Sequence, residues 1–202
     1  MYNTKKIGII GYGGFAREIM CRLKKNSYDI FINEKFITND IKNIVKPFEN
    51  LDVNKYKILI CIADSKIRNS IVNLLPSNTE YFTYIDKNAK LFDKKTIVIG
   101  KGSIIGYGSV LSTNINIGEF SHVNVNTTIG HDTTINDYLT TGAGVHISGD
   151  MNIGKHVFLA TGCVLRNKIN ICDNVVIGMN SVVNKNITES GVYVGSPVIK
   201  IK

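Results

Sequence analysis

Residues 99–134 read, in groups of six, IGKGSI, IGYGSV, LSTNIN, IGEFSH, VNVNTT and IGHDTT. The period continues without insertion to Val183, and every sixth residue from Ile99 is a large aliphatic except Thr141. A second position, four residues after each aliphatic, is small or apolar, as in Ser103 and Cys163. Both positions can face a core, so each hexad predicts one short strand followed by a corner.

Three hexads would close one triangular turn, and successive turns would stack as parallel strands about 4.8 Å apart. Residues 18 apart then lie above one another, and the 15 hexads form about five coils. Glycine or asparagine often follows the aliphatic directly, and we expect the corner there because both tolerate positive φ. A β-sandwich would instead alternate with period two and turn about every 8 to 12 residues. The end of the stack needs a cap, which residues 189–202 would supply unless they form a subunit contact.

The first 85 residues follow a different pattern, in which apolar runs alternate with helical stretches. Such alternation predicts a small parallel α/β sheet. We therefore predict two domains, a Rossmann-like nucleotide- or sugar-binding domain over residues 1–85 and an all-β parallel β-helix with its cap over residues 86–202. The expected strands are Ile7–Ile10, Tyr28–Ile32, Tyr56–Ile62 and Tyr81–Ile85, and the expected helices are Arg17–Lys25 and a segment from Asp64 to about Leu75.

A glycine turn follows the first apolar run and fits the pattern G-x-G-x-x-A, with Gly11, Gly13 and Gly14. Backbone N–H groups at such a turn can hold a phosphate, and an acidic residue after the second strand often binds the ribose. Asn33 and Glu34 stand near that place. The alternative is a glycine turn that only tightens strand-to-helix packing.

Composition sets broad limits. The chain has 202 residues, 44% hydrophobic and 20% charged, with a net charge of +8. The net positive charge suits anionic ligands such as coenzyme A or nucleotides. The sequence has no stripe of basic and aromatic residues of the kind that binds nucleic acid. No apolar run is long enough to span a membrane, so we expect a cytoplasmic protein. Of the four cysteines, Cys61 and Cys163 are expected to be buried and reduced.

Candidate chemistry centres on His131 and Asp132, which occupy a predicted corner and should point outward. A histidine beside a carboxylate suits a general base, because the carboxylate stabilises the imidazolium. Gly149 lies 18 residues later, one coil above His131, where its backbone N–H can serve as an oxyanion donor. The alternative is a surface histidine in a polar corner.

A column of small residues, Gly142, Ala160 and Gly178, also follows the step of 18 and would form a groove for an extended ligand. Simple corner geometry is the alternative explanation. The remaining histidines, His122, His146 and His156, fall on different faces or coils, so no three-histidine metal site is expected within one chain.

The hexads resemble the left-handed parallel β-helix of bacterial hexapeptide acyltransferases. The opening KKIGIIGYGGFAREI, the segments ILICIADSKIR, ITINDY and HISGDMNIG, and the closing GVYVGSPVIKI extend the resemblance to NeuD/PglD-like sugar acetyltransferases over nearly the whole chain. The sequence departs from their usual pattern at Phe15, Asn33-Glu34, Ala63, Thr140 and the tail from Pro197.

The resemblance implies acetyl transfer from acetyl-CoA, without a metal, to a nucleotide-linked amino sugar for surface glycans. It implies a homotrimer with the active site between neighbouring β-helices. It also implies that His131 is the base, that Asp132 tunes it and that the Gly149 N–H holds the oxyanion. Coenzyme A would lie along Gly142, Gly149, Ala160 and Gly178, and the sugar nucleotide would bind at Gly11, Gly13, Gly14, Asn33, Glu34 and Asp64.

Three alternatives stay open at this point. The acceptor could be a hydroxyl, as in O-acetylation of sialic acid. The protein could be a metal-dependent lyase of the carbonic anhydrase type on the same β-helix. It could also be a non-catalytic structural or binding β-helix, which would leave the His131–Asp132 corner without a role.

Overall fold

The computed structural model describes residues 5–202. Their contacts divide the chain into two compact units, with the division between Phe82 and Thr83. In the described part of the chain, no helix has the length and hydrophobicity needed to cross a bilayer.

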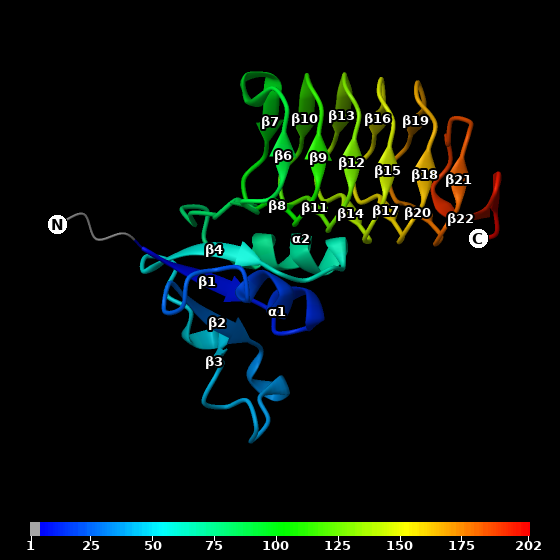
Figure 1. Cartoon of the computed structure of the whole chain (residues 1–202). Helices are drawn as coiled ribbons and strands as arrows, with labels where there is room; N and C mark the ends of the chain where they lie inside the picture. Colours follow the sequence, from blue (N-terminus) through cyan, green and yellow to red (C-terminus); the bar gives the residue numbers. More distant parts are fainter. Residues whose placement is uncertain (1–4) are drawn as a thin grey trace. The chain divides into compact units, whose positions relative to one another are not determined.

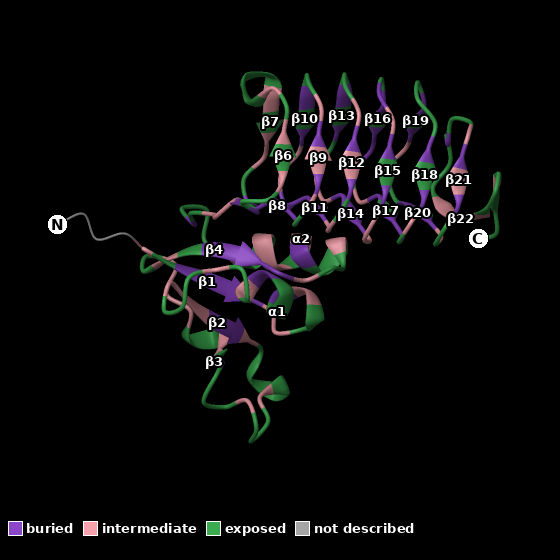
Figure 2. Ribbon diagram, in the orientation of Figure 1, coloured by how far each residue is buried: buried purple, intermediate pink, exposed green. Residues whose placement is uncertain are grey.

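The first unit is a four-stranded parallel sheet with strand order β3-β2-β1-β4. Its elements are β1 (Lys6–Ile10), α1 (Gly14–Met20), β2 (Tyr28–Ile32), the 3₁₀ turn η1 (Glu34–Phe36), β3 (Lys46–Pro47), the 3₁₀ turn η2 (Phe48–Asn50), β4 (Tyr56–Ile60) and α2 (Ser65–Leu74). The centres of β1, β2 and β4 are buried, whereas the turns between them are exposed (Figures 1 and 2).

Two predictions for this unit were wrong in detail. The first helix begins at Gly14 and ends at Met20, because the N–H groups of Arg22 and Leu23 bond carbonyls only three residues back. The fourth strand is β3 rather than Tyr81–Ile85. Tyr81 makes one isolated bridge to Ile58, whereas Tyr84–Ile85 is β5 and pairs with β8 in the second unit.

The second unit is a coil of short strands in three sheets, whose strands pair in parallel except in the final hairpin (Figure 1). One sheet contains β7 (Ile97–Ile99), β10 (Ile115–Ile117), β13 (Thr133–Ile135), β16 (Asn152–Ile153) and β19 (Asn170–Ile171). Another contains β6 (Lys90–Leu91), β9 (Val110–Leu111), β12 (Thr128–Ile129), β15 (His146–Ile147), β18 (Val164–Leu165) and β21 (Val182–Val183). The third contains β5 (Tyr84–Ile85), β8 (Ile104–Ile105), β11 (His122–Val123), β14 (Thr140–Thr141), β17 (Phe158–Leu159), β20 (Val175–Ile177), β22 (Gly191–Gly195) and β23 (Val198–Lys200).

The register follows the predicted step of 18. Thr128 pairs with His146, and His146 pairs with Val164. A less regular coil precedes the repeat, in which β5 and β6 pair with strands 20 residues later and the 3₁₀ turn η3 (Lys94–Thr96) leads into β7. At the other end β22 and β23 form an antiparallel hairpin on β20, so residues 191–200 extend that sheet.

The aliphatic column and the second column both face the inside of the coil. From Ile105 to Val183 every residue of the aliphatic column is buried, and all second-column residues from Ser103 to Ile187 are at most 4% exposed. Each buried aliphatic side chain contributes roughly 1.5–3 kcal/mol before entropy is counted. The prediction of two inward columns is therefore confirmed (Figure 2).

Positive φ lies elsewhere in the hexad than the glycine pattern predicted, although it does fall at the corner assigned to His131 and Asp132. Positive φ occurs three residues after the aliphatic, at Asn114, Asp132 and Asp150 among others, rather than directly after it. Glycine follows the aliphatic for another reason: a β-carbon on Gly130 would collide with the backbone nitrogen of Gly149 in the next coil. Close approach between coils, rather than left-handed backbone, therefore selects glycine there.

Candidate active site

The corner between β12 and β13 presents His131 and Asp132 to solvent, with side chains 56% and 49% exposed. His131 Nδ1 and Asp132 Oδ2 are 2.7 Å apart. Asp132 adopts the left-handed conformation, with φ of 55°, which aspartate tolerates better than most residues. This turn of the backbone lets two consecutive side chains meet.

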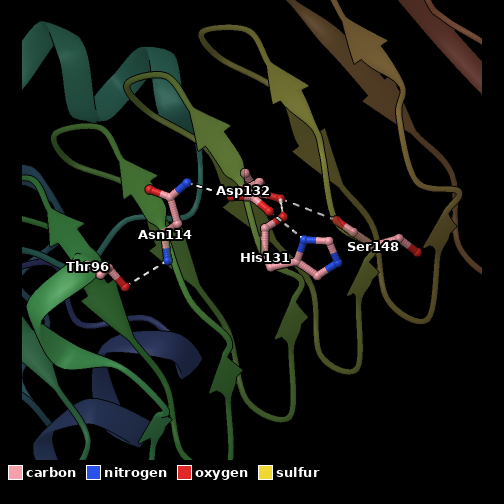
Figure 3. A network of polar contacts seen from close by, with 6 residues as sticks. Thr96, Asn114, His131, Asp132 and Ser148 are labelled. Atoms are coloured by element: carbon pink, nitrogen blue, oxygen red, sulfur yellow. Dashed lines mark hydrogen bonds and ion pairs between the residues drawn. The ribbon is translucent and has the colours of Figure 1, made fainter.

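A polar column supports Asp132 from the coil below. Asn114, 18 residues earlier, donates from Nδ2 to Asp132 Oδ1 at 2.5 Å, and the Asn114 backbone N–H donates to Thr96 Oγ1 at 2.8 Å. Figure 3 shows Thr96, Asn114, Asp132 and His131 as one connected series. The bonds from Asn114 and His131 hold the pKa of the Asp132 carboxyl below its usual range.

This low pKa sets the hydrogen-bond direction at the imidazole. Asp132 is a carboxylate at neutral pH and can only accept. His131 Nδ1 therefore donates to Asp132, and in the neutral ring Nε2 is the nitrogen that can accept a proton. The arrangement suits a general base.

Gly149 lies against the other side of this ring. A β-carbon on Gly149 would stand 2.8 Å from both Cε1 and Nε2 of His131, so only glycine fits beside the imidazole in its present position. Among residues 5–202, none accepts a hydrogen bond from the Gly149 N–H. The Gly149 N–H is therefore free to donate to an oxyanion that forms beside the imidazole.

Asp150 is a residue of this corner that the sequence reasoning missed, although the step of 18 from Asp132 points to it. His131, Asp132 and Asp150 each offer one ligand atom within 4.8 Å of the others. Both Asp132 oxygens and His131 Nδ1 are already engaged, which favours proton transfer over metal binding at this corner.

The small column Gly142, Ala160 and Gly178 lies at a different corner of the chain, after β14, β17 and β20. A β-carbon on Gly142 would meet the Thr161 backbone nitrogen at 2.5 Å, and one on Gly178 would meet Val194 at 2.7 Å. Coil packing thus accounts for the small residues, and within one chain they do not join the His131 corner.

The other histidines are dispersed. His122 is buried in the coil, His146 bonds Thr128 Oγ1 at 2.9 Å, and His156 stacks on Tyr138 with ring centroids 4.8 Å apart. Their side chains belong to different sheets or corners and do not converge.

The first unit contains a cavity of about 720 Å³. Of the residues predicted to bind the acceptor, Gly11, Gly13, Gly14 and Asn33 line it. Gly11 has φ of 112°, which favours glycine, and Gly13 and Gly14 have open space where a β-carbon would stand. The sequence analysis missed the mainly apolar remainder of the lining, which includes Phe36, Phe48, Ile67, Ile71 and Leu74.

Glu34 and Asp64 do not line this cavity. Asp64 caps α2, and its Oδ1 accepts from the N–H groups of Lys66 and Ile67 at 2.8 and 3.0 Å. Arg68, fully buried on the same helix, donates to the carbonyl oxygens of Ile62 and Ala63 at 2.9 and 2.8 Å. These contacts fix the loop after β4, so the role of Asp64 seen here is to cap the helix.

Comparisons with known proteins agree with this architecture. No family model matches the chain. A GDP-perosamine N-acetyltransferase from Escherichia coli O157:H7 is 26% identical over 206 residues, covering 94% of this chain and 82% of the relative. The structure of WeeI from Acinetobacter baumannii AYE is 26% identical with a TM-score of 0.87 and covers 98% of this chain and 100% of its own.

A third similarity is with a perosamine N-acetyltransferase variant from Caulobacter crescentus in complex with CoA and GDP-perosamine. It is 17% identical with a TM-score of 0.87, over 98% of both chains. These similarities confirm the predicted fold class, a small parallel α/β sheet followed by a left-handed β-helix, and the resemblance to sugar acetyltransferases.

Proposed function

We propose that this chain is an acetyl-CoA-dependent acetyltransferase that N-acetylates a nucleotide-linked amino sugar, of the 4-amino-4,6-dideoxy type, for a bacterial surface glycan. The observation that carries the proposal is the proximity of Gly149 to the His131–Asp132 pair. The E. coli relative, aligned over 82% of its length, is a GDP-perosamine N-acetyltransferase by name, which supports the same reaction.

In the proposed mechanism, the acceptor amine attacks the thioester carbonyl carbon while His131 Nε2 takes a proton from the amine nitrogen. Asp132 stabilises the imidazolium through Nδ1. The Gly149 N–H stabilises the oxyanion of the tetrahedral intermediate. Collapse of this intermediate breaks the C–S bond, and the proton on Nε2 passes to the departing thiolate. The products are the acetamido sugar and coenzyme A.

The assembly we propose is a homotrimer with its active site between neighbouring β-helices. Because Gly142, Ala160 and Gly178 lie at another corner than His131, they would form a wall of the coenzyme A site only when contributed by a neighbouring copy. The cavity of the first unit, with its glycine turn and Asn33, is the proposed nucleotide site; Glu34 and Asp64 would act at its edge. Acetyl-CoA as donor implies a cytoplasmic location.

The test is a screen for release of coenzyme A thiol from acetyl-CoA with GDP-, UDP- and dTDP-linked 4-amino sugars, alongside free sialic acids. We expect turnover with an amino sugar and a loss of about 10³-fold or more in His131→Ala. His146→Ala, a second exposed histidine on β15, is the matched control and should retain full activity. Turnover only with sialic acids would identify an O-acetyltransferase, and unaltered turnover in His131→Ala would refute the mechanism.

A further inference from the structure

A buried hydroxyl lies on the inner side of the candidate active site. Thr133 begins β13 and faces the inside of the coil, where it is 1% exposed. On the neighbouring coils the matching inward positions are apolar and equally buried, namely Ile115, Met151 and Ile169. A hydroxyl among such side chains is unfavourable unless it is hydrogen-bonded. The partners of Thr133 therefore indicate what this side chain does, and the proposed mechanism gives it no role.

The hydroxyl contacts two carbonyl oxygens on successive coils. Thr133 Oγ1 donates to His131 O at 3.2 Å and to Ser148 O at 3.4 Å, and the two oxygens share the single proton of the hydroxyl. Figure 3 shows Ser148 beside the His131–Asp132 pair. Ser148 O belongs to the peptide whose N–H is that of Gly149. One buried side chain thus bonds the peptide that follows the proposed base and the peptide that carries the proposed oxyanion donor.

These contacts determine the direction of the Gly149 N–H. The peptide bond between Ser148 and Gly149 is trans, so its C=O and N–H point in opposite directions. Because Ser148 O points into the coil toward Thr133, the Gly149 N–H points out of it, and the His131 ring packs against Gly149 on that outer side. In the described part of the chain, this N–H has no acceptor.

The same arrangement recurs at another corner, where the protein itself supplies the acceptor. Ser103 Oγ donates to Gly118 O at 3.0 Å, again 15 residues later. The next N–H, that of Glu119, donates to the Asp137 carboxylate oxygen Oδ1 at 3.0 Å. An inward hydroxyl on the carbonyl therefore accompanies an outward N–H that bonds an oxygen outside the coil. At Gly149 the oxyanion of the proposed intermediate would occupy the place of that carboxylate oxygen.

We propose that Thr133 is a positioning residue for acetyl transfer, because its hydroxyl holds the Ser148–Gly149 peptide so that the Gly149 N–H meets the oxyanion as it forms. This inference rests on the proposed function, and it adds a residue that is buried inside the coil rather than exposed to the substrates. A fixed donor lowers the barrier because the peptide need not rotate while charge develops. Without the hydroxyl the peptide can tilt, which weakens a contact made mainly in the transition state.

The experiment compares the full wild-type chain with Thr133→Val, which keeps the shape but loses the hydroxyl, and with Thr133→Ser, which keeps the hydroxyl. In Thr133→Val we expect kcat to fall about 5- to 30-fold, with the KM values for acetyl-CoA and the amino sugar within about twofold of the wild type. Thr133→Ser should restore most of kcat. The acid limb of the rate profile should stay in place in both variants, because the hydroxyl acts on the oxyanion donor rather than on the base.

Ser103→Ala is the matched control, since it removes the equivalent buried hydroxyl from a corner outside the candidate site. It should lower the melting temperature, as Thr133→Val does, but leave kcat unchanged. A loss of activity that follows the melting temperature in all three variants would show a merely structural role and overturn the proposal. The proposal is also overturned if Thr133→Val keeps its kcat, if Thr133→Ser loses as much as Thr133→Val, or if the acid limb moves.

Nuclear magnetic resonance supplies a readout that needs no ligand. The nitrogen resonance of an amide responds to hydrogen bonding at the preceding carbonyl oxygen. The Gly149 resonance should therefore move in Thr133→Val and return toward its wild-type position in Thr133→Ser; an unmoved resonance in Thr133→Val would overturn the proposal. If the resonance behaves as expected but the wild type acetylates no acceptor in the screen, the proposed function fails, while the orientation of the Gly149 N–H by Thr133 stands.

Discussion

Gly149 leaves room for the imidazole of His131 only because it lacks a side chain: a β-carbon would lie 2.8 Å from His131 Nε2. The two residues are 18 apart and belong to successive coils. The backbone contact Asp150 N to His131 O, at 2.8 Å, fixes their separation. The regular repeat therefore holds the proposed base and the proposed oxyanion donor together without any loop closure.

Gly149→Ala should lower kcat by about 10²-fold or more, because the methyl group displaces the imidazole that the mechanism requires. The clash should also lower the free energy of unfolding by about 1–3 kcal/mol. A double-mutant cycle with His131→Ala, followed by thermal unfolding, checks the cause. In the His131→Ala background the added methyl should cost little stability; an equal cost in both backgrounds would contradict the contact.

Asn114→Ala should raise the pKa of Asp132, because it removes the Asn114 side-chain hydrogen bond, which is the main cause of the low pKa. We expect kcat to fall about 3- to 10-fold with KM nearly unchanged, and the acid limb of the rate profile to move to higher pH. Asn116→Ala, an exposed amide on β10 of the same coil, is the matched control. An unshifted acid limb would show that Asn114 does not act through Asp132.

The same pKa shift has a consequence for stability. The Asp132 carboxyl has a lower pKa in the folded protein than in the unfolded chain. Its contribution to the free energy of unfolding is therefore fully present above about pH 4 and is lost as the pH falls through the folded pKa. The difference in melting temperature between wild type and Asp132→Asn should therefore shrink below pH 4. A constant difference down to pH 2 would contradict the shift.

Arg68→Ala should destabilise the first unit. The buried guanidinium satisfies the carbonyl oxygens of Ile62 and Ala63, and removing it leaves both without these bonds beside a void. We expect a loss of about 3 kcal/mol in urea unfolding, together with weaker nucleotide binding at the cavity that Ile62 and Ala63 line. Arg22→Ala on the surface is the control and should change neither quantity.

The buried thiols should make the protein sensitive to alkali. Burial raises the pKa of Cys61 and of Cys163 to about 12, whereas unfolded thiols ionise near 8.5. The contribution of the two thiols to the free energy of unfolding is fully present below about pH 8.5. It is lost as the pH rises toward 12, by up to about 1.4 kcal/mol per pH unit for each thiol. Unfolding of the wild type and of Cys163→Ala from pH 8 to 11 tests this; parallel pH curves would refute it.

The proposed trimer predicts complementation. Light scattering should give about three times the 22.3 kDa chain mass. If the small corner of one copy lines the donor site of another, mixing inactive His131→Ala chains with chains carrying a bulky Ala160→Trp should restore part of the activity. A monomeric mass, or no recovery after confirmed subunit exchange, would contradict the intersubunit site.

The repeat made the second unit predictable in detail. Ile129 and Ile147 pair as a step of 18 requires, and the same step places Gly149 over His131. The corner at His131 and Asp132 was predicted correctly, whereas positive φ directly after the aliphatic was wrong. Glycine after the aliphatic looks the same in sequence whether it serves positive φ or close coil packing. Only the backbone geometry at Asp132 and Gly130 separated the two.

The first unit was less predictable because its contacts are not periodic. The apolar lining of its cavity includes Phe36, Phe48 and Ile71, which come from separate segments. No local sequence pattern predicts that these side chains lie together. Asp64 likewise reads as a site residue in sequence, but it caps α2. Helix capping and ligand binding use the same carboxylate chemistry, so the sequence could not distinguish them.

By itself the sequence determined the stacked coil, its inward columns and the pairing of His131 with Gly149, since a strict period converts distance along the chain into position in space. Tertiary structure decided what depends on side-chain direction and on non-local closure. It joined Asn114 to Asp132, turned His131 Nδ1 toward that carboxylate and separated the small column from this corner. Hydrogen bonds act over a few ångströms, a scale that spacing in sequence does not resolve.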